Sequence, residues 1–337
     1  MRAVGFTCAY TPLALIHAAG LMPYRLLPTA GDHIPDQAGA ILHDNLCPHV
    51  KRVLDRGLAG ELPDALAGIV LMGSCDAMRR LADAWRVHRP EDPLVLLDLP
   101  STSDAADVRS LTGELDELSR TLGRWSGTPV DPGRLRESIV LYAELARLTA
   151  DLARASSRGA LQRWLNRTVT EPPEAVLEEL RGAVLAAPGG GVPLYLFGNV
   201  LSDPAALELL EECGARIVDD DLCTGSRQLT SLEGDPGAEP LPWLSRRLLE
   251  RPPCARTLEP AGPGLARRIV ERARAAGARG VIAHVLKFCD PYLARLPAVR
   301  AALRGAGLPL LVLEGDCTLR SLGQQRTRIE AFVEMLS

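Results

Sequence analysis

Three cysteines of this sequence share a local setting that suits metal binding. The pattern predicts a helix start directly after each of Cys47, Cys75 and Cys289, and a strand before the last two. In open α/β sheets, ligands bind at the carboxyl ends of the strands. A helix amino terminus also favours thiolate over thiol, and thiolate is the form that binds metal. We therefore expect these thiols to project into one crevice between two halves of the protein.

The stretch around Cys289 shows this setting most clearly. An apolar run rich in β-branched residues begins at Val281 and predicts a buried strand that ends at Cys289. Asp290 is then expected to cap a new helix, with Pro291 at its first position. The sequence thus places this thiol between the end of a strand and the start of a helix.

The spacing of the three cysteines indicates which kind of metal site they could form. A zinc finger would show paired cysteines two to four residues apart, and the sequence contains no such pair. Three thiolates without a fourth suit an iron–sulfur cluster that keeps one iron open for chemistry, although such clusters usually have denser cysteine runs. The alternative for any single cysteine is a buried thiol that acts as a small hydrophobic side chain.

The other five cysteines differ in position. Cys8, Cys223 and Cys254 lie beside predicted turns on similar edges and could join the first three. Cys213 lies on a helix and is expected to be structural. Cys317 follows a predicted strand, and its role stays open.

Other polar residues that could bind metal can also be explained by structural roles. The aspartates at positions 219–221 could bind a divalent cation, but a turn and a helix cap explain them as well. The histidines show no metal-ligand spacing, and we expect core or surface roles for His17 and His284.

The elements that would position these cysteines alternate between strand and helix in both halves of the chain. We expect strands at residues 3–6, 24–27, 67–72, 93–97, 192–197, 215–218, 281–289 and 308–313. Residues 28–45 have a loop composition, and residues 103–187 show long helical periodicity without a convincing strand. The predicted fold is α/β, with two doubly wound parallel-sheet lobes (residues 1–102 and 188–337) and a helical insert between them (residues 103–187).

Composition excludes several classes of protein. The chain has 337 residues, 47% of them hydrophobic and 24% charged, as in globular proteins with two domains. The formal net charge of -4 gives no electrostatic basis for binding nucleic acid or an anionic membrane. The sequence has no apolar run of membrane-spanning length and no signal-peptide pattern, so we expect a cytoplasmic protein with reduced cysteines.

Several segments spread along nearly the whole chain carry a family resemblance. They are residues 5–12, 16–21, 47–48, 74–76, 220–227, 287–291 and 323–332. With these segments the sequence resembles the 2-hydroxyacyl-CoA dehydratase and benzoyl-CoA reductase superfamily. The run Phe288-Cys289-Asp290-Pro291 and the closing helix are its most specific parts.

The resemblance implies a fold, a cofactor and a chemistry. It implies two α/β lobes around a 4Fe–4S cluster held by three cysteines, which match Cys47, Cys75 and Cys289. An ATP-dependent iron–sulfur activator protein would deliver one electron of low potential, and the cluster would pass it to the carbonyl of a CoA thioester. The ketyl radical then makes the β-proton removable, which no side-chain base near neutrality could achieve unaided. A homologous second subunit would complete a homo- or heterodimer.

Two departures from the family pattern leave alternatives open. Dehydratases commonly carry one or two glutamates directly after the first proline, whereas this chain has Pro12-Leu13-Ala14-Leu15, so the catalytic residues stay unassigned. In addition, Cys8, Cys223 and Cys254 resemble the subgroup with a double-cubane 8Fe–9S cluster, which needs six thiolates. The first hypothesis is a single-cluster subunit. The second is a homodimeric double-cubane reductase of small molecules, and the third is a non-enzymatic two-lobe ligand-binding protein with scattered cysteines.

Overall fold

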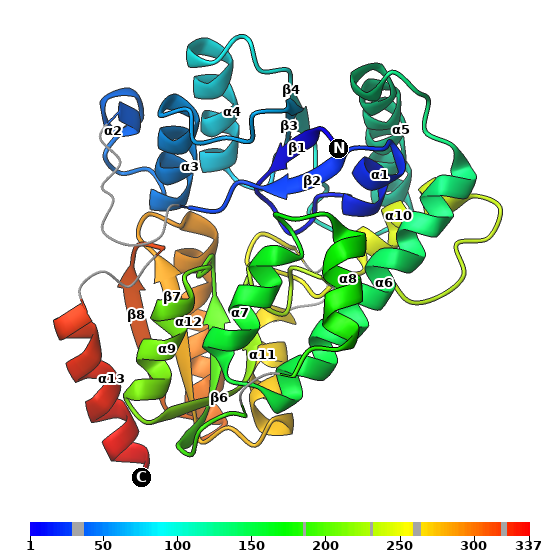
Figure 1. Ribbon diagram of the computed structural model, residues 1–337. Coiled ribbons are helices and arrows are strands. Elements are labelled where there is room, and N and C mark those ends of the chain that lie inside the picture. The colour runs from blue at the N-terminus through cyan, green and yellow to red at the C-terminus, as the bar shows by residue number, and fades with distance from the viewer. Residues whose placement is uncertain (29–36, 185–186, 230–231, 259–263, 318–321) are drawn as a thin grey trace.

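The computed structural model describes residues 1–28, 37–184, 187–229, 232–258, 264–317 and 322–337. Within these residues, two four-stranded sheets form the frame of the protein (Figure 1). The first has the order β2–β1–β3–β4, with strands β1 (Ala3–Phe6), β2 (Met22–Arg25), β3 (Leu66–Met72) and β4 (Leu94–Leu97). The second has the order β6–β5–β7–β8, with strands β5 (Val192–Gly198), β6 (Ala215–Asp221), β7 (Gly280–Leu286) and β8 (Leu310–Gly315). All neighbouring strands are parallel, which confirms the predicted α/β class.

Both sheets have the same topology. In each sheet the strand that is first in sequence, β1 or β5, lies in space between the second and the third. The order of the strands therefore reverses between β1 and β3, and again between β5 and β7. In open α/β sheets, ligands bind at the carboxyl ends of the strands beside such a switch point.

Helices cover both faces of each sheet. On the first sheet, α3 (Pro48–Leu58) and α4 (Asp76–His88) pack on one face, and α1 (Leu13–Ala18) and α5 (Ala105–Ser126) on the other. On the second sheet, α9 (Pro204–Glu212) and α13 (Leu322–Leu336) cover one face, and α11 (Gly264–Ala275) and α12 (Asp290–Gly305) the other. Strands β3 and β7 are apolar along nearly their whole length because both of their faces are buried.

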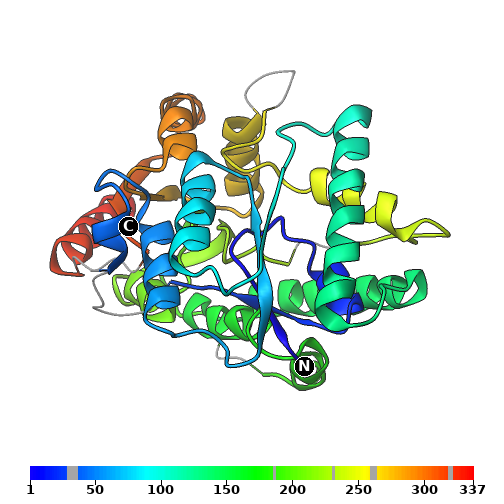
Figure 2. The same ribbon diagram turned by 90° about the horizontal axis from the view of Figure 1, so that it is seen from above.

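The segment of the chain between β4 and β5 is helical, as its periodicity predicts. After α5 come α6 (Pro132–Ala155), α7 (Arg158–Arg167) and α8 (Pro173–Arg181), which run along one side of the molecule beside both sheets (Figures 1 and 2). Helix α10 (Pro240–Leu249) follows β6 in sequence but packs with α5 and α6 in the core of the first sheet. The domain boundaries predicted at residues 102 and 187 stay a prediction.

The prediction of a loop over residues 28–45 is wrong for part of that segment. Helix α2 (Gln37–Ile41) forms there, whereas residues 29–36 lie outside the described residues. Ala38 is fully buried, and its backbone N–H donates to the carboxylate of Asp55 on α3 at 3.1 Å. A tertiary contact, which local composition does not encode, therefore stabilises this short helix. None of the helices in the described part of the chain is long and apolar enough to cross a membrane.

His284 lies within β7 and has the core role that its position in the sequence predicts. Its side chain is 0% exposed, and Nε2–H donates to the carbonyl of Asp316 at 3.0 Å. Burial lowers the pKa of His284 to about 4, although the Asp316 carbonyl opposes this shift. The imidazole is therefore neutral in the folded protein at neutral pH.

We expect His284 to lower the free energy of unfolding at acidic pH. In the unfolded chain His284 has a pKa of about 6.5 and binds a proton below that pH, whereas in the folded protein it binds one only near pH 4. The folded state therefore loses stability relative to the unfolded state as the pH falls. For this one residue the free energy of unfolding should fall by about 2 kcal/mol between pH 7 and pH 5. Urea denaturation of the native protein and of His284→Gln at both pH values measures this difference. Equal losses in the two proteins would contradict the assignment.

Candidate functional site

The carboxyl ends of strands from both sheets border one cavity of about 120 Å³. On the first sheet, Cys8 follows β1, Arg25 ends β2 and Cys75 follows β3. On the second sheet, Cys223 follows β6 and Cys289 follows β7. The cavity therefore lies where the two switch points face each other, as the topology of doubly wound sheets predicts for a ligand site.

Six of the eight cysteines line this cavity. They are Cys8, Cys47, Cys75, Cys223, Cys254 and Cys289. The structure thus brings the three cysteines expected to bind a cluster together with the three that could join them. Of the other two, Cys213 ends α9 and packs in the core of the second sheet, and Cys317 is fully buried outside the cavity lining. The role of the six thiols as ligands stays a prediction.

Cys47, Cys75 and Cys289 each occupy the N-cap position of a helix, namely α3, α4 and α12. The expectation that Asp290 caps α12 is wrong, because the helix already begins at Asp290. Strand β7 also ends at Leu286, three residues before the thiol. The intervening turn contains Phe288, whose φ of 58° is the only positive value at a non-glycine residue in the described part of the chain.

Cys47, Cys75 and Cys289 line the same cavity and influence one another electrostatically. The pKa of Cys47 is raised to about 12, mainly by burial and also by the neighbouring thiols of Cys289 and Cys75. The pKa of Cys75 is likewise raised by burial and by Cys289, while backbone N–H groups at the start of α4 oppose the shift. At neutral pH these thiols carry their protons until a metal displaces them.

Cys8, Cys223 and Cys254 form a second mutually coupled group. Burial raises the pKa of Cys223 to about 12; the Arg227 guanidinium opposes this shift, whereas Cys254 and Cys8 add to it. Burial also raises the pKa of Cys8, with Cys254 as a further cause. Cys254 also raises the pKa of Cys289, so the two groups of cysteines are neighbours in the cavity.

This lining fits a polynuclear cluster better than a single ion. No three His, Cys, Asp or Glu side chains among the described residues converge closely enough to hold one metal ion. Thiolates that bind a cubane are spread over its different irons and surround a volume instead of meeting at a point. Six thiols around one cavity have this arrangement.

Two arginines at the cavity had no role assigned from the sequence, although Arg227 ends the family segment of residues 220–227. Arg25 is only 1% exposed; its Nε donates to the Thr7 carbonyl at 3.1 Å, and its Nη1 donates to the Cys223 carbonyl at 2.8 Å. Arg227 is ion-paired with Asp221, and its Nη2 donates to the Tyr292 hydroxyl at 2.8 Å. Both guanidinium groups lower the pKa of Cys223 and so favour its thiolate form.

His49, two residues after Cys47, was also missed. It lines the cavity and is 4% exposed, yet neither ring nitrogen has a hydrogen-bond partner among the described residues. Burial, assisted by the positive charge of Arg25, lowers the pKa of His49 to about 3. The ring is therefore neutral at physiological pH and offers one N–H donor and one acceptor.

Asn199, which follows β5, holds the Cys289 loop in place. Its Nδ2 donates to the Cys289 sulfur at 3.0 Å, and its Oδ1 accepts the backbone N–H of Leu286 at 3.0 Å. Its backbone carbonyl accepts the N–H of Cys223 at 2.9 Å. One residue therefore positions cysteines of both groups.

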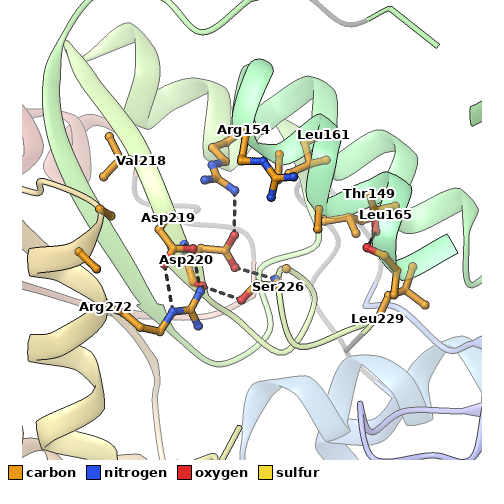
Figure 3. Close-up of a pocket in the computed structure, with 17 residues that line it drawn as sticks. Thr149, Arg154, Leu161, Leu165, Val218, Asp219, Asp220, Ser226, Leu229 and Arg272 are labelled. Carbon is orange, nitrogen blue, oxygen red and sulfur yellow. Dashed lines mark hydrogen bonds and ion pairs between the residues drawn. The ribbon is translucent and has the colours of Figure 1, made fainter. Parts of the chain in front are cut away.

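The aspartates at 219–221 lie outside this cavity lining, and arginines account for them. Asp219 pairs with Arg272 and Asp220 with Arg158, on the wall of a second cavity of about 450 Å³ between β6 and helices α6 and α7 (Figure 3). Asp221 pairs with Arg227. Ion pairs explain these carboxylates together with the predicted turn, because Oδ1 of Asp220 also accepts the backbone N–H groups of Leu222 and Ser226 at 3.2 and 2.8 Å.

Comparison with known proteins identifies the family. The family model described as "2-hydroxyglutaryl-CoA dehydratase, D-component" matches residues 8–336, nearly the whole chain. The chain belongs to this family. The resemblance inferred from the cysteine motifs is thereby confirmed.

Relatives of this dehydratase family member include subunits of dehydratases and of a reductase. It is 26% identical over 351 residues to the lactoyl-CoA dehydratase subunit beta of Anaerotignum propionicum, covering 99% of this chain and 91% of that one. The (R)-2-hydroxyglutaryl-CoA dehydratase subunit beta of Acidaminococcus fermentans is 24% identical over 358 residues, covering 99% and 92%. One subunit of the benzoyl-CoA reductase of Thauera aromatica is 26% identical over 314 residues, covering 88% and 81%. The family member is therefore an enzyme subunit, which sets aside the hypothesis of a non-enzymatic ligand-binding protein.

We expect Asn199→Asp to destabilise the protein. The substitution keeps the oxygen that accepts from Leu286 but replaces the N–H donor with an oxygen that faces the Cys289 sulfur. Loss of this buried hydrogen bond should lower the free energy of unfolding by about 1–3 kcal/mol at pH 7, measured by urea denaturation. The control is Asn45→Asp at an exposed position, which should stay within about 0.5 kcal/mol of the native protein. If both variants matched the native protein, Asn199 would not have this role.

Proposed function

We propose that this chain is the iron–sulfur subunit of a 2-hydroxyacyl-CoA dehydratase or benzoyl-CoA reductase type of enzyme, and that it binds its cluster in the six-cysteine cavity. The single observation that carries the proposal is the convergence of six distant cysteines at the facing strand ends of two sheets. Deprotonated cysteines are the usual protein ligands of iron–sulfur clusters. The bound cluster would supply one-electron transfer and an open iron that acts as a Lewis acid on a substrate oxygen.

In the simplest form of the proposal, Cys47, Cys75 and Cys289 hold one 4Fe–4S cluster. Each of these thiols lies at a helix amino terminus, where backbone N–H groups and the helix dipole stabilise a thiolate. Three ligands leave one iron of a cubane without a protein ligand, which is where a substrate oxygen could bind.

A second candidate is a reductase with a double-cubane cluster, acting on small molecules as a homodimer. The observation that favours it is the position of Cys8, Cys223 and Cys254 on the same cavity, coupled to one another and next to Cys289. In the single-cluster form these three thiols would have no metal to bind, although Arg25 and Arg227 favour the thiolate of Cys223. We therefore favour the double cubane as the cofactor of this chain.

The substrate and partners follow from the relatives. Their names refer to CoA thioesters, so we propose a CoA thioester as the substrate. The family resemblance supports an ATP-dependent iron–sulfur activator as the electron donor. Two of them are called beta subunits, which supports a homologous partner subunit. The first turn of α1, in the Pro12-Leu13-Ala14 segment, carries no carboxylate. If the reaction is a dehydration, the group that handles the proton therefore lies elsewhere in this chain or in the partner.

We expect about eight irons per chain after anaerobic purification, compared with about four for a single cubane, by cubane stoichiometry. Cys289→Ala should abolish the brown absorbance, and Cys223→Ala should reduce the iron content to that of one cubane or less, with the fold retained in circular dichroism. The matched control is Cys213→Ala, which removes a core thiol and should leave the iron content unchanged. Full iron content in Cys289→Ala, or a native protein without iron, would refute the proposal.

A further inference from the structure

Arg25 and His49 have unused hydrogen-bonding atoms inside the cavity. The Nη2 of Arg25 and both ring nitrogens of His49 are buried and lack a hydrogen-bond partner among the described residues. The two side chains are 1% and 4% exposed, so bulk solvent hardly reaches these atoms. Buried polar groups are nearly always hydrogen-bonded, and each such exception calls for a partner.

The charge of Arg25 also lacks a counterion. No carboxylate in the described part of the chain pairs with it, whereas the nearby Arg227 has Asp221. A buried, unpaired cation is costly, and the only acidic groups that influence Arg25 are the thiols of Cys223 and Cys8. An anion in the cavity would complete the environment of this guanidinium.

The position of the two residues connects the two cysteine groups. Arg25 interacts electrostatically with Cys8 and Cys223 of the second group, and also with His49. His49 lies in the first turn of α3, two residues after Cys47 of the first group. The unpartnered donors therefore lie where the two groups of cysteines meet.

We propose that Arg25 and His49 donate hydrogen bonds to anionic sulfur of the bound cluster at the junction of the two cysteine groups, and that they stabilise its reduced form. This inference rests on the proposed function. Reduction adds negative charge to the cluster, so a neighbouring cation and N–H donors stabilise the reduced state more than the oxidised state. Both residues therefore raise the reduction potential of the cluster.

The test is a redox titration of the anaerobic, iron-loaded protein without substrate, followed by electron paramagnetic resonance. In Arg25→Gln the reduced form should become at least tenfold less favoured, which lowers the midpoint potential by about 59 mV for one electron. His49→Phe, which keeps a ring but removes its N–H, should shift the potential in the same direction. Arg25→Lys and His49→Gln keep a charge or a donor and should restore most of the native potential.

Controls separate this role from a general effect on the fold. Arg167→Gln and His17→Phe make the same kinds of substitution outside the cavity lining, and both should leave the potential unchanged. Arg25 also makes structural hydrogen bonds, so if Arg25→Gln loses its iron, the potential of His49→Phe decides the question.

Native potentials in iron-loaded His49→Phe and Arg25→Gln would overturn the inference and leave the proposed function intact. If Arg25→Gln does not hold iron, a native potential in His49→Phe alone would overturn it. A shift that occurs only when substrate is present would also overturn it, because the pair would then bind substrate and not the cluster. A native protein without iron would instead refute the proposed function.

Discussion

Thiols that are far apart in a sequence can meet in one cavity only if the elements that carry them face each other. In this protein two parallel sheets of the same strand order bring their carboxyl ends together. The loops after β1, β3, β6 and β7 then each carry a cysteine to the same place, from positions as distant as Cys8 and Cys289. The apolar strands and the helices on their faces keep these edges in position, so the site depends on the packing of both sheets.

Burial of the site also shifts the pKa values of its residues and leaves some of its polar atoms without partners. One small cavity is surrounded by thiols with raised pKa values, a neutral imidazole, and a guanidinium that pairs with no carboxylate among the described residues. Without a bound group, this combination leaves polar atoms unsatisfied and a cation unbalanced, both of which cost free energy. An anionic cluster would balance the charge of Arg25 and provide acceptors for its free N–H groups, while the thiols become its ligands. This electrostatic argument is independent of the family assignment.

Much of the frame could be predicted from the sequence, because apolar runs and helix starts are local signals. The settings of Cys47, Cys75 and Cys289 were predictable for this reason, since a proline or an aspartate directly after the cysteine indicates a helix start. The exact cap was not predictable: Cys289, and not Asp290, is the N-cap of α12, and it follows a turn through Phe288 with a φ of 58°. Arg25, His49 and Asn199 could not be identified, because their roles depend on contacts between segments far apart in the chain. Helix α2 was missed for the same reason, since its contact is with Asp55 on α3.

The most direct test of the central claim is the crystal structure of anaerobically prepared protein, with anomalous diffraction recorded at the iron absorption edge. The account predicts iron density inside the cavity, bonded to the sulfurs of Cys47, Cys75 and Cys289 on one side and to those of Cys8, Cys223 and Cys254 on the other. Iron on the first side alone would reduce the cofactor to a single cubane. A cavity without iron, or iron bound elsewhere on the chain, would contradict the account.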